Sequence, residues 1–451
     1  MDSSVPKHRV VAHPLPTDKI NSGGVIAAVQ PQHSEMSASH NIVDQYSPLG
    51  QATIMQNSSA RLEFQIFSSR INQVKGIYLE LPITNNSGTN DLELISPYFF
   101  CSLIEILVDN NSEQEVYPEG QLFAHRVMTD EQTFNITRFS NLLNPETLTG
   151  RDTAAANPIV IGQGLTRYIY IPINNSLFEQ TKIPFASISS TIRFRFTFDV
   201  FTNITASTNG MIVPGNLAVS SAQLYIFGSG LSRIGSDEIQ TALVNNLHSF
   251  SYYKQERQVI NNGATLSGSR PKQSLTNLNG TYANILMALR ELNPTKEMQY
   301  QWKFVTGGTG ANIPYNPSVF QIRDVTLNDS NGSAYSLNNL GYFLGKWFAP
   351  LLTGAPEEGA KYSTFADKFS YVEWNLADDS WYELRQGNPG GIVINNAWSL
   401  EYTIGNAGAS ILPFSQITYP SVGLSTETLV IADRMYSCTL NKEGKLKCMA
   451  Q

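Results

Sequence analysis

The stretch TIRFRFTFDV, residues 191–200, decides the fold class of this chain. Its apolar positions are Ile192, Phe194, Phe196, Phe198 and Val200, and its polar positions are Arg193, Arg195, Thr197 and Asp199. Successive side chains of a β-strand point to opposite faces, so this alternation places every aromatic ring on one face. The stretch therefore predicts a strand with one face buried in a sandwich core and the other facing solvent.

The same alternation recurs along the chain, in segments about ten residues apart. It is found in RLEFQIF at 61–67, from Ile77 to Ile83, from Tyr168 to Ile173, from Met298 to Phe304 and from Trp398 to Ile404. Loops rich in Asn, Gly, Ser and Pro separate these segments. Runs of strands joined by such loops are typical of antiparallel sandwiches, and they do not match alternating βαβ units.

Helical patterns are few and short. Ser236 can cap a helix through Leu247, Pro118 can open one through Arg126, and Leu340–Ala349 precedes a proline that would end it. The segment TYANILMALREL, residues 281–292, fits a strand and a helix equally well. Periodicity therefore leaves that segment open.

Composition excludes several classes of protein. Of 451 residues, 41% are hydrophobic and only 15% are charged, which argues against coiled coils and against bulk disorder. The net charge of −7 argues against a chain that wraps nucleic acid. Three cysteines cannot form a disulfide scaffold or a zinc cluster. The N-terminus has no apolar region typical of a secretory signal, and the longest uncharged stretch, Val200–Ser232, is too polar for a membrane span.

The order of the predicted elements repeats once. Strands, a helix near 118–128 and further strands are followed by strands, a helix near 340–349 and further strands. We therefore expect an N-terminal arm over residues 1–50, a first jelly roll over 51–247 and a second over 248–451, each roll an eight-stranded antiparallel sandwich. The arm holds four of the six histidines, and we expect it to order only against a neighbour.

Several segments together resemble one family over roughly residues 55–451. They are SSRINQVKGIYLELPI at 68–83, CSLIEILVDNNSEQEVYPEGQLF at 101–123, RYIYIPINNSLFEQTKIPFASISSTIRFRFTFDV at 167–200, NPGGIVINNAWSLEYTIGN at 388–406 and MYSCTLNKEGKLKCMA at 435–450. In this order they are similar to the double jelly-roll major capsid proteins of the lineage that includes the adenovirus hexon. The resemblance rests on the order of the segments, because none of them is diagnostic alone.

The resemblance implies an all-β protein with two side-by-side jelly rolls and a few short helices in the loops. It implies a structural subunit without enzymatic activity, which trimerises into pseudo-hexagonal capsomers that tile an icosahedral shell. The implied partners are further copies of the chain, minor capsid and vertex proteins, and an internal membrane in some viruses, without sequence-specific binding to nucleic acid. The implied location is the virion. A carbohydrate-active or carbohydrate-binding β-sandwich protein is the alternative.

Candidate chemical sites are weak, and we predict no catalytic, cofactor-binding or metal-binding residue. GSGLSRIG at Gly228–Gly235 lacks the Lys-Ser/Thr of a phosphate loop and predicts a turn and a helix cap. The histidines of the arm, His8, His13, His33 and His40, lack metal-ligand spacing, and His125 and His248 lie near no recognisable nucleophile. The acidic pair Asp378–Asp379 lies near Trp374, Trp381, Tyr382 and Glu383, as in a glycosidase. Neighbouring carboxylates on an extended chain point to opposite faces, which favours a polar turn.

The last segment predicts a hairpin. Lys442, Glu443 and Gly444 form a three-residue loop with Gly444 in the left-handed conformation. Leu440 then faces Leu446, Thr439 faces Lys447, and Cys438 faces Cys448. A bridge between the two opposed cysteines is geometrically allowed, and free thiols are the expected state.

Overall fold

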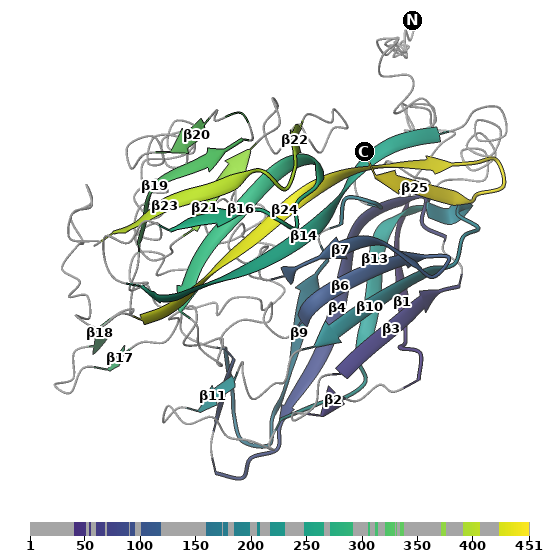
Figure 1. The fold of residues 1–451 in the computed structure, drawn as a ribbon. Helices are drawn as coiled ribbons and strands as arrows, with labels where there is room; N and C mark the ends of the chain where they lie inside the picture. Colours follow the sequence, from purple (N-terminus) through teal and green to yellow (C-terminus); the bar gives the residue numbers. More distant parts are fainter. Residues whose placement is uncertain are drawn as a thin grey trace, which may run out of the picture.

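The computed structural model shows two β-sandwiches side by side (Figure 1). The residues it describes are 40–50, 54–55, 60–67, 70–89, 91–94, 101–118, 159–173, 175–178, 185–198, 205–207, 217–230, 248–265, 271–291, 305–306, 312–313, 321–329, 331, 334–337, 371–375, 391–405 and 424–450. Every strand pair among these residues is antiparallel, as the alternating sequence segments predict.

The first sandwich has a large sheet made from widely separated parts of the chain. Its strands, in spatial order, are β1 (His40–Tyr46), β13 (Gln223–Gly230), β4 (Gln73–Asn85), β12 (Leu217–Val219) and β2 (Ile54–Met55), and β9 (Thr166–Pro172) also pairs with β4. Strand β1 lies within the range predicted as an arm, but it pairs along its whole length with β13 of the same chain. The segment that could form an arm therefore ends before His40.

The opposing sheet contains the alternating stretch at residues 192–198. Its order is β3 (Ala60–Ile66), β10 (Ile192–Phe198), β6 (Cys101–Val108) and β7 (Asn111–Val116). Along β10 the residues alternate between buried and half-buried, with all three phenylalanines in the core. On the outer face Arg193 bonds to Glu63 at 3.0 Å, and Arg195 bonds to Glu105 at 3.4 Å. The predicted division of apolar and polar faces is confirmed.

Two short elements complete the first half. A three-stranded sheet comprises β11 (Thr205–Ser207), β5 (Leu92–Leu94) and β8 (Ile159–Ile161). A single 3-10 turn, η3 (Phe185–Ser187), precedes β10 and buries Phe185 in the core. This turn also forms part of the surface on which the C-terminal hairpin docks.

The second sandwich repeats the plan of two facing sheets. One sheet has the order β14 (His248–Thr265), β24 (Leu424–Leu440), β16 (Gly280–Glu291) and β21 (Tyr371–Asn375), with β22 (Ile392–Ile394) on β16 and β25 (Leu446–Ala450) on β24. The other has the order β15 (Lys272–Ser274), β23 (Ser399–Gly405), β19 (Gln321–Asn328) and β20 (Ala334–Leu337). A separate ribbon joins β17 (Val305–Thr306) to β18 (Asn312–Ile313).

Two long strands join the sandwiches. β14 and β24 pair along their full lengths, and they run from the second sandwich onto one end of the first (Figure 1). Phe250 and Tyr252 of β14 and Leu440 of β24 belong to the same buried cluster as the core of the first sandwich. The core of the first sandwich therefore extends onto residues of the two strands that also belong to the second sandwich.

The sheet that contains β24 is buried on both faces. Leu429 and Ile431 pack with the core of the first sandwich, while Val430 and Ala432 pack with the core of the second. A strand buried on both faces reads as a continuous apolar run, and TLVIA at 428–432 is such a run. Such a run shows no alternation of apolar and polar residues, so periodicity does not predict this strand.

The ambiguous segment 281–292 is a strand. β16 covers Gly280–Glu291, and residues Tyr282 to Met287 are all buried, so its environment is apolar on both sides. Tertiary contacts on both faces therefore decide in favour of the strand. Pro118 is helical, but the rest of 118–126 and the predicted helices at 236–247 and 340–349 lie outside the described residues, as does 298–304.

Candidate functional site

The residues considered as catalytic or metal-binding candidates do not come together in the part of the chain that the structure describes. Trp374 lies in β21, opposite Ile285 of β16, while Asp378–Asp379, Trp381, Tyr382, Glu383 and His125 lie outside the described residues. In the part of the chain that the structure describes, no group of three His, Cys, Asp or Glu residues could hold a metal ion. The same residues contain no helix long and apolar enough to cross a membrane.

The glycine-rich stretch after residue 227 begins as a strand. Gly228 and Gly230 are strand residues at the end of β13, although their glycine-rich sequence predicts a turn. A Cβ on Gly228 would lie 2.3 Å from the backbone oxygen of Gln73, so this glycine permits a close approach of β13 to β4. That prediction of a turn is wrong for Gly228–Gly230, and the remaining residues to Gly235 are outside the described part.

The seam between the two sandwiches is built around one buried glutamine. Gln114 of β7 is 3% exposed, and its Nε2 donates to Tyr253 O at 2.9 Å and to Ser176 Oγ at 3.0 Å. Its Oε1 accepts a bond from Leu177 N at 3.2 Å. Ser176 Oγ in turn accepts from Tyr253 N at 2.7 Å. A buried amide with satisfied donors and acceptor fixes the position of β14 on the first sandwich.

Charged and aromatic side chains extend this seam on both sides of Gln114. Lys254 Nζ lies 2.8 Å from Glu115 Oε1, and Tyr252 OH donates to Glu113 O at 3.0 Å. Tyr117 N donates to Gln255 Oε1 at 2.7 Å. The ring of Tyr117 lies under the guanidinium of Arg257, and burial and then the charge of Glu115 raise the pKa of its hydroxyl to about 12. The hydroxyl is therefore protonated at neutral pH.

The C-terminal hairpin docks on the first sandwich. Gly444 has φ 76° and its O accepts from Ser189 N at 2.8 Å, which confirms the predicted left-handed glycine. Glu443 O accepts from Ser189 Oγ at 2.6 Å, and Leu446 N donates to Ser190 Oγ at 3.1 Å. These bonds join residues more than 250 positions apart in sequence. The tip of the hairpin thus closes the end of the first sandwich.

An aspartate in the turn between β6 and β7 meets the same hairpin. Asp109 and Asn110 have φ 47° and 72°, as a two-residue hairpin turn of type I′ requires. Asp109 Oδ1 accepts from Thr191 N at 2.8 Å, and its Oδ2 lies 3.7 Å from Lys445 Nζ. Burial opposes the charged form, but the bonds from Thr191 and Ser190 and the charge of Lys445 outweigh it and lower the pKa of Asp109.

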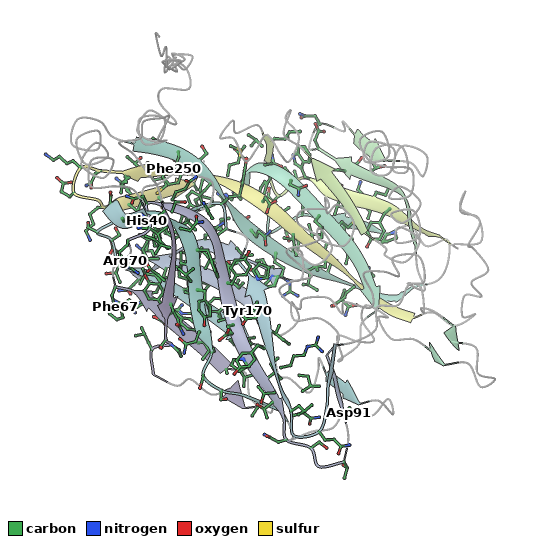
Figure 2. All side chains as sticks on the ribbon, turned by 180° about the vertical axis from the view of Figure 1, so that it is seen from behind. His40, Phe67, Arg70, Asp91, Tyr170 and Phe250 are labelled. Carbon is green, nitrogen blue, oxygen red and sulfur yellow. The ribbon has the colours of Figure 1, made fainter. Side chains whose placement is uncertain are left out.

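The outer face of the large first sheet carries an aromatic patch. We define the aromatic patch as Val43, Tyr78, Tyr168, Tyr170, Tyr225 and Phe227. Val43 lies directly opposite Phe227, and the two side chains are 50% and 38% exposed. The rings of Tyr78 and Phe227 meet edge to face with centroids 5.3 Å apart. Figure 2 shows the labelled Tyr170 on this sheet.

One carboxylate lies within the aromatic patch. Tyr225 OH donates to Glu80 Oε1 at 3.5 Å. Burial and then hydrogen bonding to Glu80 raise the pKa of Tyr170 to about 12, and burial and the charge of Glu80 raise the pKa of Tyr225. Both phenols are therefore neutral donors at physiological pH. The patch combines apolar rings with hydroxyl groups, a composition that is typical of protein–protein interfaces.

No pattern in the sequence marks the seam. Gln114 and Ser176 are ordinary polar residues in a strand and in a loop, and nothing in their spacing distinguishes them from exposed residues. The aromatic patch could have been found, because Tyr168 and Tyr170 alternate with buried isoleucines in β9. That alternation predicts that the outward face of this strand carries tyrosines. The outward face of a solvated strand would usually carry charged residues.

No protein-family profile and no curated protein matches this sequence. Solved structures do match in three dimensions. The PBCV-1 virus capsid has a TM-score of 0.62 at 12% identity, covering 93% of this chain and 98% of that chain. The chain is a double jelly roll. The structure of the Sputnik virophage has a TM-score of 0.57 at 10% identity, covering 93% and 89%, and the Faustovirus major capsid protein has 0.55 at 11%, covering 90% and 91%.

The two jelly rolls are therefore the two sandwiches described above, and the seam holds them in one arrangement. The predicted fold class is confirmed. The features of the described residues that could serve a function are the seam between the rolls, the docked hairpin and the exposed aromatic patch.

Proposed function

We propose that this chain is a major capsid protein, a structural subunit that trimerises into pseudo-hexagonal capsomers of an icosahedral virus shell. The observation that carries the proposal is the match to the PBCV-1 capsid over 93% of this chain, because a share that large includes residues of both rolls. Three copies of a rigid two-lobed chain present six similar lobes, and a six-lobed outline can tile a surface. The structures named above are virus structures, and none is a carbohydrate-active protein.

The proposal also assigns a role to each part of the chain. The first roll runs from His40, where β1 begins, to residue 247, the second covers residues 248–451, and the segment before His40 is an arm that orders against a neighbouring subunit. The chain works without catalysis and without a cofactor. Its location is the shell of the virion, and its partners are further copies, vertex and minor capsid proteins, and an internal membrane where the virus has one.

The aromatic patch is the surface that we assign to contact between copies. Patches of exposed apolar and aromatic side chains mark interaction sites on soluble proteins, and stable subunit interfaces bury about 1,200 Å² or more. A solvated outer face of a sandwich sheet would carry charges, whereas Val43, Tyr168 and Phe227 are exposed here. Neutral tyrosine hydroxyls can bond across an interface at a low desolvation cost.

Light scattering of the purified chain tests the proposal. We expect a particle of about three times the chain mass of 49.8 kDa, with a hexagonal outline in negatively stained electron micrographs. A stable monomer at micromolar concentration would contradict it. Val43→Glu should dissociate the trimer, and the matched control Val393→Glu, at a side chain 68% exposed on β22, should leave it intact. A Val43→Glu variant that remains a trimer in light scattering would exclude the aromatic patch as the interface. It would not contradict the proposal that the chain forms a trimer.

A further inference from the structure

We propose that Cys438 and Cys448 form a disulfide-bonding site that reversibly cross-links β24 to β25. The two residues lie directly opposite each other in the register of the hairpin, as the sequence predicted. Both are free thiols, and Cys448 Sγ donates to Cys438 Sγ across 3.0 Å. The inference concerns the single chain, so it does not rest on capsid assembly.

The backbone geometry of this pair suits a bridge. Asn441 N donates to Lys445 O at 3.0 Å, which makes Asn441 and Lys445 a hydrogen-bonded pair. Hydrogen-bonded and non-hydrogen-bonded pairs alternate along an antiparallel ladder, so Cys438 and Cys448 form a non-hydrogen-bonded pair. Cα atoms of such pairs lie about 4.5 Å apart, at the short end of the roughly 4.4–6.8 Å that disulfides span. A bridge therefore needs rotation of the side chains and little movement of the backbone.

The surroundings assign a different role to each thiol. Cys438 is fully buried in the core of the first roll, whereas Cys448 is partly exposed. The hydrogen bond with Cys448 and then burial raise the pKa of Cys438, so Cys438 stays a neutral thiol. Tyr252 and Glu113 are the titratable neighbours from β14 and β7. An oxidant from solvent therefore meets Cys448 first, and Cys438 resolves the intermediate.

The oxidant that we invoke is a small disulfide of the glutathione type. The thiolate of Cys448 attacks one sulfur of this disulfide, the S–S bond of the oxidant breaks, and one small thiol leaves after taking up a proton. Cys438 gives up its proton as its sulfur attacks Sγ of Cys448, the S–S bond between Cys448 and the second small thiol breaks, and that small thiol departs with the proton. Two protein thiols are oxidised to one disulfide, and the external disulfide is reduced to two thiols. Excess small thiol reverses both steps.

The cross-link would hold β25, a strand at the edge of its sheet, against β24. In the described part of the chain β25 pairs only with β24, so it is an edge strand of its sheet. Edge strands separate more readily than central strands, because one side of their ladder is open. A bond between residues ten positions apart restricts the unfolded hairpin and keeps its tip, Gly444, on Ser189.

The test uses the full-length protein in glutathione buffers of increasing oxidised-to-reduced ratio. Samples are quenched in acid, unfolded, blocked with N-ethylmaleimide and digested for mass spectrometry. We expect a linked peptide that joins Cys438 to Cys448 within one chain, while Cys101, buried in the first roll, is recovered blocked. Failure to find this peptide at any ratio in folded protein overturns the proposal, and so does linkage through Cys101 or between chains.

Thermal unfolding supplies the second measurement. Oxidised wild type should melt roughly 3–10 °C above the reduced protein. Cys448→Ser should show no shift that depends on the oxidant, and the matched control Cys101→Ala should keep the wild-type shift. A Cys448→Ser variant that still responds to the oxidant would place the reactive thiols elsewhere and overturn the assignment. Loss of the trimer in any variant is read separately by light scattering, which keeps this result apart from the proposed function.

Discussion

Replacement of Gly444 by alanine would test whether the docked hairpin stabilises the first roll. Gly444 has φ 76°, and a left-handed conformation costs an L-residue about 1–2 kcal/mol. A Cβ at this position would also lie 2.3 Å from Ser187 O and 3.0 Å from Ser189 N, so the tip must move off η3. Such steric overpacking typically costs about 1–3 kcal/mol more. We therefore expect Gly444→Ala to destabilise the protein by about 2–5 kcal/mol.

Gly164 offers a matched control for the backbone term. It has φ 67°, and a Cβ there would meet no atom within 4 Å. Gly164→Ala should therefore cost only the conformational term of about 1–2 kcal/mol. The difference between the two variants measures the docking contact alone.

Differential scanning calorimetry in the presence of a reductant is the appropriate assay, because free thiols remove any contribution from a bridge. For a cooperative unit of about 200 residues, 1 kcal/mol shifts the melting temperature by about 2–4 °C. Gly444→Ala should therefore melt about 2–12 °C below Gly164→Ala. Equal melting temperatures for the two variants would refute the reasoning, because they would show that the tip of the hairpin does not bear on the first roll.

Three further predictions address the seam, the turn and the arm. Gln114→Ala should destabilise the chain by about 1–3 kcal/mol and speed hydrogen exchange at Leu177, because it leaves the buried Leu177 N without its acceptor; the exposed control Gln45→Ala should change neither. Asp109 has a lowered pKa, so its stabilising effect is present above its unfolded pKa near 3.8 and is lost as the pH falls through the folded value. Asp109→Asn should therefore lower the free energy of unfolding at pH 7 by at most about 1 kcal/mol after solvent screening, and this difference should vanish once the pH has fallen below the folded pKa of Asp109; a constant difference across pH would contradict this. Deletion of residues 1–39, which spares β1, should leave trimers intact in light scattering and prevent closed shells in electron micrographs; normal shells would refute a role for the arm in assembly.

The strand elements could be predicted because alternation is a local property. The alternation around Phe194 and Phe196 predicts the buried face of β10 from a few neighbouring residues, and this prediction needs no knowledge of distant contacts. The hairpin at Gly444 was equally local, since turn chemistry and a two-residue period fix its register, including the opposition of Cys438 and Cys448. The resemblance to the double jelly roll added the order in which such elements combine.

Where the environment is apolar on both sides, periodicity fails. The run TLVIA in β24 has no alternation because its two faces enter two different cores, and 281–292 could not be assigned for the same reason. Composition identifies such a segment as buried. It cannot say whether the neighbours are arranged for a strand or for a helix.

The sequence by itself determined the all-β class, the faces of the alternating strands and the register of the last hairpin, because each depends on residues close together in the chain. Only the tertiary structure decided that Gln114 joins the two rolls, that β1 belongs to the first roll and that the hairpin tip docks on Ser189. Those contacts link residues from about sixty to more than 250 positions apart. Their energy comes from burial and from hydrogen bonds that exist only after the sheets have packed, and no local pattern encodes which distant partner will complete them.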